Sequence, residues 1–172
     1  MPHDLVIRGR AVEPDPWRVF GLAADGSTQP LPEGPVLVPL AYWKEHRAAL
    51  AARGDVGVWL APTDEPRDIA PDLGAVKLVA VHFPKNGDGR GYSTASLLRR
   101  RHGYQGELRA FGDLGRDQLF ILARVGFDSF RLGERHDPHA ALAAFDDFSV
   151  KYQGSVDDPV PLFRKRAAAT TP

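Results

Sequence analysis

The chain has 172 residues, a length that fits one domain with a full hydrophobic core. It contains no cysteine, which excludes disulfides, thiolate zinc sites, iron–sulfur clusters and cysteine nucleophiles. The 22 basic and 22 acidic residues balance, so no overall charge draws the chain to nucleic acid or to an anionic membrane, and neither partner is expected. Met1-Pro2-His3-Asp4 lacks the pattern of a signal peptide, and no apolar run approaches the ~20 residues of a membrane span. These features predict a cytoplasmic protein.

The first 35 residues differ in pattern from the rest. Residues 5–7 and 18–20 look like short strands, and prolines interrupt the sequence around them. This pattern predicts an N-terminal β flap that belongs to the same domain as the remainder of the chain.

From residue 36 to about residue 155, apolar runs of strand length alternate with segments of helical period. This predicts an α/β domain whose mainly parallel sheet has about five βα units. An open sheet is favoured, with an incomplete βα barrel as the alternative. The tail, residues 156–172, has little to bury and is expected to be frayed. Strands are predicted at 36–40, 56–61, 76–83, 107–111 and 128–132, and helices at 41–53, 63–73, 94–102, 114–125 and from Asp137 through Tyr152.

The most informative predicted loop follows the strand at 76–83, whose apolar run indicates a central position in the sheet. Ligands of parallel α/β proteins bind at the carboxyl ends of the strands. Gly89 and Gly91 allow close backbone approach, Arg90 offers a planar fork for an oxyanion, and Ser93 is expected to cap the next helix. The loop suits a sulfate, sulfite or phosphate group, with Asp88 as a candidate for proton transfer. The alternative is a set of tight turns in which Arg90 pairs with a surface carboxylate.

A second candidate group lies on the predicted strand at 107–111. Alternation places Glu107 and Arg109 on one face of an interior strand, where charges must be paired or line a polar cavity. The structural alternative is an ion network of Glu107 with Arg99 or Arg109. Asp113 follows the strand and either caps the next helix, the favoured role, or points into the site.

His82, near the end of the central strand, is the best-placed candidate acid or base, although an interior histidine without a catalytic role is the commoner outcome. His136 and His139 have only a weak metal spacing, so no metal is expected. No nicotinamide, flavin or nucleotide fingerprint is present, and no cofactor is evident.

Several of these residues also belong to a known pattern. The pattern comprises Phe83-Pro84, 88–93, Leu98-Arg99, Gly103-Tyr104, 106–110, Gly112-Asp113, Asp117-Gln118 and 126–128. On these residues the chain resembles the bacterial domain of unknown function 934 family, whose label is an oxidoreductase of sulfite reduction. The resemblance is dense over about fifty residues and implies a role beside assimilatory sulfite reductase, without implying catalytic residues.

Three functions are expected as alternatives. The first is an accessory protein or oxidoreductase of assimilatory sulfate and sulfite reduction, with a small oxyanion held by Arg90, Arg109, Ser93 and the loop amides. In this function His82, Asp88 and Glu107 are the candidates for proton transfer. The second is a non-catalytic protein that docks on sulfite reductase or a neighbouring enzyme of sulfur assimilation. The third is a βα enzyme of another pathway that binds a phosphate ligand.

Overall fold

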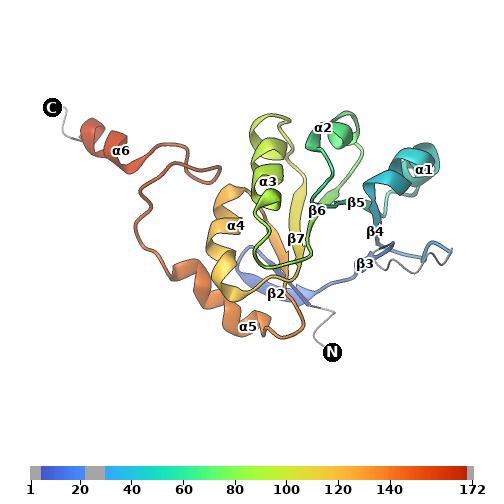
Figure 1. The fold of residues 1–172 in the computed structure, drawn as a ribbon, viewed down its shortest axis with the longest axis horizontal. Coiled ribbons are helices and arrows are strands. Elements are labelled where there is room, and N and C mark those ends of the chain that lie inside the picture. The colour runs from blue at the N-terminus through green and yellow to red at the C-terminus, as the bar shows by residue number, and fades with distance from the viewer. Residues whose placement is uncertain (1–4, 22–29, 170–172) are drawn as a thin grey trace.

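The computed structural model describes residues 5–21 and 30–169, with side chains as far as residue 166 (Figure 1). It is an α/β fold built on one open, mixed sheet of eight strands in the order β2-β1-β8-β7-β6-β5-β4-β3. The strands are β1 (Leu5–Arg8), β2 (Ala11–Pro14), β3 (Arg18–Val19), β4 (Val36–Pro39), β5 (Val56–Leu60), β6 (Leu78–Phe83), β7 (Glu107–Gly112) and β8 (Ser129–Arg131).

Short helices follow most of the parallel strands. They are α1 (Leu40–Arg53), α2 (Pro66–Ile69), α3 (Arg90–Arg100), α4 (Leu119–Val125), α5 (Pro138–Ala141) and α6 (Leu162–Ala169), with 3-10 turns η2 (Ala70–Asp72), η3 (Arg116–Gln118) and η4 (Leu142–Asp146). The predicted glycine stops are confirmed at Gly54 and Gly126, which end α1 and α4 in the left-handed region. No helix of the described residues is both long enough and apolar enough to cross a membrane.

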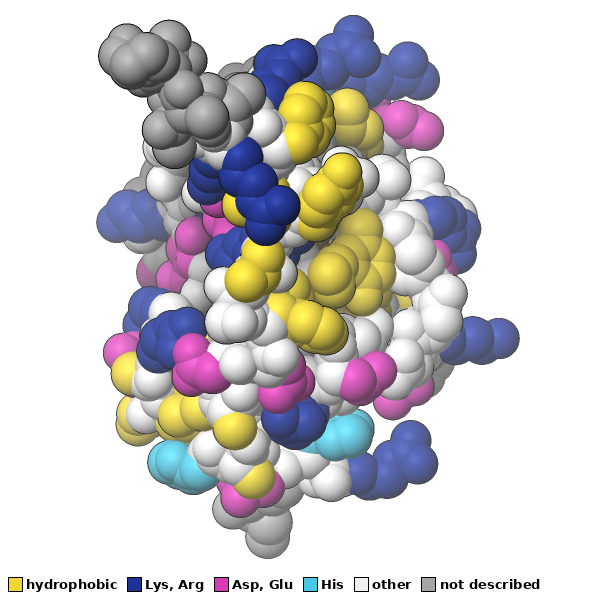
Figure 2. All heavy atoms as spheres, turned by 90° about the vertical axis from the view of Figure 1, so that its left-hand side faces the viewer, with side chains coloured by type: hydrophobic (Ala, Val, Ile, Leu, Met, Phe, Trp, Pro, Cys, Tyr) yellow, Lys and Arg dark blue, Asp and Glu magenta, His cyan; other side chains and the backbone are white. Residues whose placement is uncertain are grey.

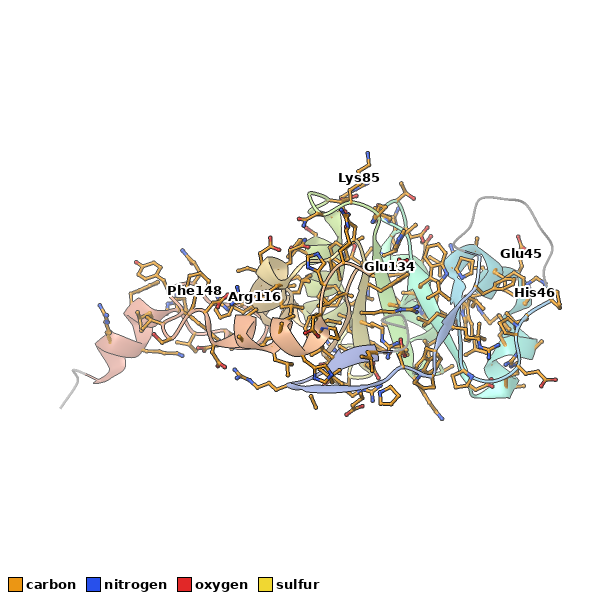
Figure 3. All side chains as sticks on the ribbon, turned by 90° about the horizontal axis from the view of Figure 1, so that it is seen from below. Glu45, His46, Lys85, Arg116, Glu134 and Phe148 are labelled. Atoms are coloured by element: carbon orange, nitrogen blue, oxygen red, sulfur yellow. The ribbon has the colours of Figure 1, made fainter. Side chains whose placement is uncertain are left out.

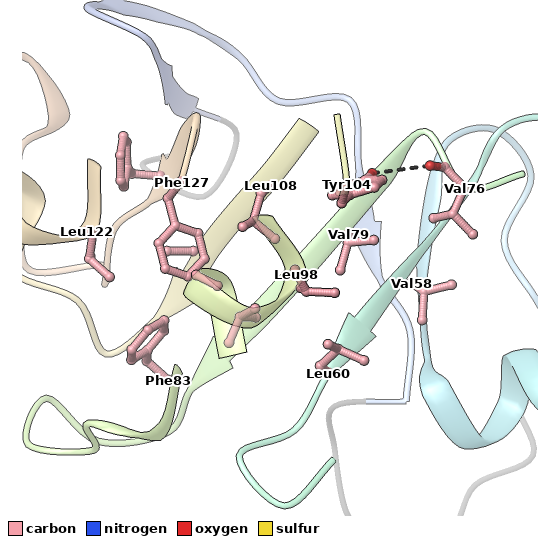
Figure 4. Packing of buried hydrophobic residues seen from close by; sticks show 14 of the residues in the cluster. Val58, Leu60, Val76, Val79, Phe83, Leu98, Tyr104, Leu108, Leu122 and Phe127 are labelled. Atoms are coloured by element: carbon pink, nitrogen blue, oxygen red, sulfur yellow. Dashed lines mark hydrogen bonds between the residues drawn. The ribbon is translucent and has the colours of Figure 1, made fainter. Parts of the chain in front are cut away.

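Helices α1 to α5 cover one face of the sheet and form the main core. Apolar side chains of β4 to β8 alternate toward this face and pack against the helices, as expected for strand geometry. Figure 4 shows the centre of this core, where Leu98 of α3 lies over β6 and β7. The Tyr104 hydroxyl is a polar group within this apolar cluster. It donates to the Val76 carbonyl at 3.1 Å (Figure 4), which satisfies its need for a hydrogen bond. Burial raises the pKa of that hydroxyl well above its ordinary value.

The opposite face of the sheet is covered by the N-terminal segment. A smaller cluster of Leu37, Trp59, Leu78, Ala80 and Phe111 lies there, packed against Trp17 and Val19. Figure 3 shows the N-terminal strands running along the side of the sheet away from Lys85. The central strand β6 is therefore buried on both faces, as its apolar run predicts, but by a chain segment on one side and helices on the other.

The sheet must curl, because residues 15–17 alone join β2 at one edge to β3 at the other. Four residue steps span at most about 14 Å, whereas a flat sheet of this width would separate its edges by about 34 Å. The predicted open sheet is confirmed. The predicted mainly parallel sheet of about five βα units is wrong in detail. Among the described residues, five pairs of neighbouring strands are parallel but two pairs, β1 with β2 and β1 with β8, are antiparallel, so the sheet is mixed. The segment expected to form a flap supplies strands to both edges.

Two predicted helices also differ from the structure. Helix α3 begins at Arg90, not after Ser93, because the Asp88 carboxylate accepts the Arg90 backbone N–H at 3.1 Å. The last predicted helix starts as expected at Asp137, whose side chain accepts from the His139 N–H, but η4 ends it at Asp146. Ser149 and Tyr152 are therefore not helical, and the chain crosses to the end of α4 instead. Helix α6 lies within the tail that was expected to be frayed.

Candidate functional site

The predicted oxyanion loop lies at the carboxyl end of β6, as expected. Two of its charged residues bind each other: Arg90 donates to Asp88 through Nε at 2.9 Å and through Nη2 at 2.6 Å. These bonds, followed by the backbone N–H of Arg90, hold the pKa of the Asp88 carboxyl down at about 2. Asp88 therefore occupies the face of the guanidinium that an oxyanion would use.

Two other residues hold the loop in place. The backbone N–H of Asn86 donates to the Asp113 carboxylate at 3.3 Å, and a carboxylate oxygen of Asp113 lies 3.8 Å from the Arg135 guanidinium. The favoured capping role of Asp113 is wrong, because Gly115 is the N-cap of η3. Buried Gln118 donates to the Asn86 carbonyl at 3.0 Å and to the Tyr92 hydroxyl at 3.2 Å. The loop is thus fixed at both of its ends.

The glycines of the loop have different roles. A Cβ at Gly91 would lie 2.4 Å from Cζ of the buried Phe83 ring, so Gly91 allows α3 to approach the sheet. A Cβ at Gly87 or Gly89 would meet nothing within 4 Å, so these two positions face open space. Ser93 is exposed on the first turn of α3. Gly91 therefore serves packing, while Gly87 and Gly89 leave their side of the loop accessible.

His82 lies at the same end of the sheet but on the face that the N-terminal segment covers. Its half-buried ring stacks on Phe111 with centroids 5.0 Å apart and meets Trp59 edge-on at 5.8 Å. Burial lowers the pKa of this imidazole, which favours the neutral form. The ring therefore belongs to an aromatic cluster that the sheet separates from the start of α3.

Glu107 and Arg109 lie on that covered face as well, nearer the start of their strand. Arg109 is completely buried and donates to Glu107 at 2.9 Å, to Ser129 Oγ at 3.2 Å and to Asp15 at 2.8 Å. Burial pushes the Glu107 pKa up, but the Ser129 hydroxyl and the charges of Arg109 and Arg8 outweigh it, so this pKa is lowered. The predicted Glu107–Arg109 pair is confirmed, and Asp15 is an unpredicted second charge partner of Arg109.

Arg99 takes no part in this network. Its guanidinium donates to the carbonyls of Gly126, Tyr104 and Gly106 and to the carboxylate of Asp128. The structure thus brings Asp88, Arg90 and Asp113 together at the carboxyl end, and sets Glu107 and Arg109 apart from them across the sheet. Arg90 and Arg109 do not converge on one ligand position.

The largest concentration of exposed apolar side chains lies elsewhere, where α4 meets residues 147–166, which we call the C-terminal segment. Figure 2 shows hydrophobic side chains gathered on this side of the molecule, with Lys and Arg side chains around them. The segment leaves the body beside α4 and carries α6 outward (Figure 1). The C-terminal surface comprises Ile121, Phe148, Val150, Tyr152, Val160 and Phe163, which are 45–65% exposed.

Polar bonds attach this segment to the body. The Arg124 carbonyl accepts from Ser155 Oγ at 2.7 Å and from the backbone N–H of Val156 at 3.0 Å. The Arg124 side chain donates to the carbonyl of Gln153 and to the carboxylate of Asp157. The segment is therefore held by its backbone and by the side chains of Ser155 and Asp157, while the apolar side chains of the C-terminal surface remain exposed.

Neither this surface nor Asp15 was found by sequence reasoning. Phe148, Val150 and Tyr152 alternate with polar residues, a pattern that a predicted helix obscured. Among the described residues, no group of three or more His, Asp or Glu side chains is placed to hold a metal ion.

One comparison with known proteins gives a match. The family model described as a bacterial protein of unknown function (DUF934) matches residues 57–163, which include all of β5 but its first residue, β6 to β8 and most of the C-terminal segment. Comparisons with curated proteins and with solved structures gave no match.

Proposed function

We propose that this chain, which belongs to the bacterial family of unknown function DUF934, acts as an accessory protein of sulfite reduction. In this role it docks on sulfite reductase through its C-terminal surface. The observation that carries the proposal is the exposure of Phe148 and Tyr152, each 61%, on a segment that hydrogen bonds hold in place. The choice of sulfite reductase rests on the resemblance noted in the sequence.

The composition of this surface supports docking. Aromatic side chains are enriched at the centres of protein interfaces, and each large apolar side chain that becomes buried contributes about 1.5–3 kcal/mol. Lys151, Arg164 and Lys165 lie within the same segment and supply a charged rim. Lys151 and Lys165 already pair with Asp157 and Asp158, so these two cationic side chains are positioned before a partner arrives.

Copurification tests the proposal. Tagged protein from sulfur-starved cells should retain sulfite reductase, and the Phe148→Ser/Tyr152→Ser double variant should retain much less. The matched control is Glu45→Ser/Ala49→Ser on exposed positions of α1, at the opposite end of the molecule from Phe148 (Figure 3). If the wild-type protein never enriches sulfite reductase, or if the double variant enriches it equally, the proposal is wrong.

A second candidate function is oxyanion binding at the loop between β6 and α3. The observation in its favour is that Arg90 is 58% exposed beside the open positions Gly87 and Gly89. Asp88 competes for the same guanidinium, so Asp88→Asn should raise the affinity for sulfite in calorimetry, and Arg90→Gln should remove it. No measurable sulfite binding by Asp88→Asn would rule this function out.

A further inference from the structure

Helix α4 holds the C-terminal segment at two places on one side of the helix. Phe120 and Arg124 are four residues apart, so their side chains leave the helix in nearly the same direction. The Phe120 ring contacts Phe148 with centroids 4.9 Å apart, and Lys151 lies over the same ring at 5.9 Å. Phe120 therefore contacts the beginning of the segment, and Arg124 binds its middle.

The carbonyl of Arg124 is available to the segment because α4 ends one residue later. The last carbonyls of a helix have no partner within the helix. This carbonyl accepts from Ser155 Oγ at 2.7 Å and from the backbone N–H of Val156 at 3.0 Å. Gly126 makes room for the contact, since a Cβ there would lie 3.3 Å from Cγ1 of Val156. The end of the helix therefore binds the segment directly.

The side chain of Arg124 adds a second set of bonds. Its guanidinium donates to the Gln153 carbonyl and to the Asp157 carboxylate, the latter at 3.4 Å. Lys151, which lies over Phe120, pairs with the same carboxylate, so Asp157 connects the two attachments. The Arg124 side chain is only 12% exposed, which leaves little of it for a partner protein to contact.

We infer that Arg124 is a positioning residue for docking, which acts through the C-terminal segment and not through contact with sulfite reductase. Its bonds hold the segment that carries Phe148 and Tyr152 while both rings remain exposed. Without the guanidinium the segment samples more arrangements, and only a fraction of the molecules presents both rings correctly. The apparent affinity falls in proportion to that fraction. This inference rests on the proposed function and names a residue that controls it.

Binding kinetics on immobilised sulfite reductase test the inference. Arg124→Met keeps an apolar stem and removes the donors, so it should weaken binding at least about tenfold. The loss should appear in the association rate, because fewer molecules are ready to bind, and the dissociation rate should stay unchanged. Phe148→Ser/Tyr152→Ser should instead dissociate faster, as expected when contacts with the partner are lost. Faster dissociation of Arg124→Met with unchanged association would overturn the inference.

Arg53 provides a matched control at the far end of the molecule (Figure 1). It lies in the last turn of α1 and donates to the carbonyls of Pro32 and Gly34 and to the Asp55 carboxylate. Arg53→Met therefore removes a comparable set of bonds away from the C-terminal segment, and it should bind like the wild-type protein. Equal affinity of Arg124→Met and wild type, or an equal loss in Arg53→Met, would overturn the inference.

Hydrogen exchange tests the positioning without a partner. In Arg124→Met the amides of residues 148–160 should exchange faster than in the wild-type protein, while those of β6 should not change. Ser155→Ala removes one bond of the same attachment and should act in the same direction, so it decides if Arg124→Met does not fold. Unchanged exchange of the segment would overturn the inference. If the wild-type protein does not bind sulfite reductase, the proposed function is wrong, and the exchange still decides whether Arg124 positions the segment.

Discussion

Arg109 and Asp15 form an ion pair of 2.8 Å in which both side chains are completely buried. The pair joins a central strand to the residues that connect the two edges of the sheet, so it fixes the N-terminal segment on the helix-free face. Trp17 adds to this arrangement by donating its backbone N–H to Asp15 at 3.2 Å.

Asp15→Asn should lower the free energy of unfolding by about 3–5 kcal/mol, because it leaves the buried Arg109 guanidinium without one of its charge partners. Urea denaturation measures the effect. Asp146→Asn is the control, since it breaks the exposed Arg10–Asp146 pair and should cost at most about 1 kcal/mol. Equal losses of unfolding free energy in the two variants would show that the buried pair stabilises the protein no more than the exposed pair.

Glu107 should make the protein sensitive to acid. Its pKa is lowered in the folded state, so its contribution to stability is complete above the ordinary value of 4.5 and disappears as the pH falls through the lowered pKa. Urea denaturation between pH 7 and pH 3 gives the free energy of unfolding as a function of pH. In Glu107→Gln this free energy should fall less steeply below pH 4.5 than in the wild-type protein. A variant curve parallel to the wild-type curve would be inconsistent with a charged, paired Glu107.

His82 should titrate below 6.5, because burial disfavours the imidazolium ion. As the pH falls below 6.5, the unfolded chain takes up this proton first, so stability should decrease until the lowered folded-state pKa is passed. The ring resonances followed by NMR give the midpoint, and His82→Gln assigns them by their disappearance. A midpoint at or above 6.5 would show that the ring is not shielded by Trp59 and Phe111.

Gly91→Ala should lower the free energy of unfolding by about 1–3 kcal/mol, because its Cβ would press on the buried Phe83 ring. Gly87→Ala provides the comparison within the same loop, since its Cβ would meet nothing within 4 Å. Thermal unfolding of the two variants shows whether a loss of stability comes from the clash with Phe83 or from reduced flexibility of the loop. A loss at Gly87 as large as that at Gly91 would contradict the assignment of roles.

Local patterns in the sequence were enough for the central part of the fold. The apolar run at 76–83 indicated a central strand, and β6 does lie between β5 and β7. Gly54, Gly126 and Asp137 marked helix ends correctly, because each acts through its own backbone or that of its near neighbours.

Features that depend on distant partners were not predictable in this way. Asp15 lies 94 residues from Arg109 in sequence, and β3 pairs at the edge opposite β2 only because the sheet curls. Among the candidate site residues, the Glu107–Arg109 pair was predictable, since alternation puts both side chains on one face. The ion pair between Asp88 and Arg90 depends on the conformation of the loop. The arrangement of the C-terminal surface depends on hydrogen bonds to α4.

Direct measurement of affinity between this protein and purified sulfite reductase tests the central claim most directly. Immobilised sulfite reductase should bind the wild-type protein and Glu45→Ser/Ala49→Ser alike, and should bind Phe148→Ser/Tyr152→Ser at least about tenfold more weakly, since two exposed anchors are lost. Absence of wild-type binding, or equal binding by all three proteins, would contradict docking through the C-terminal surface.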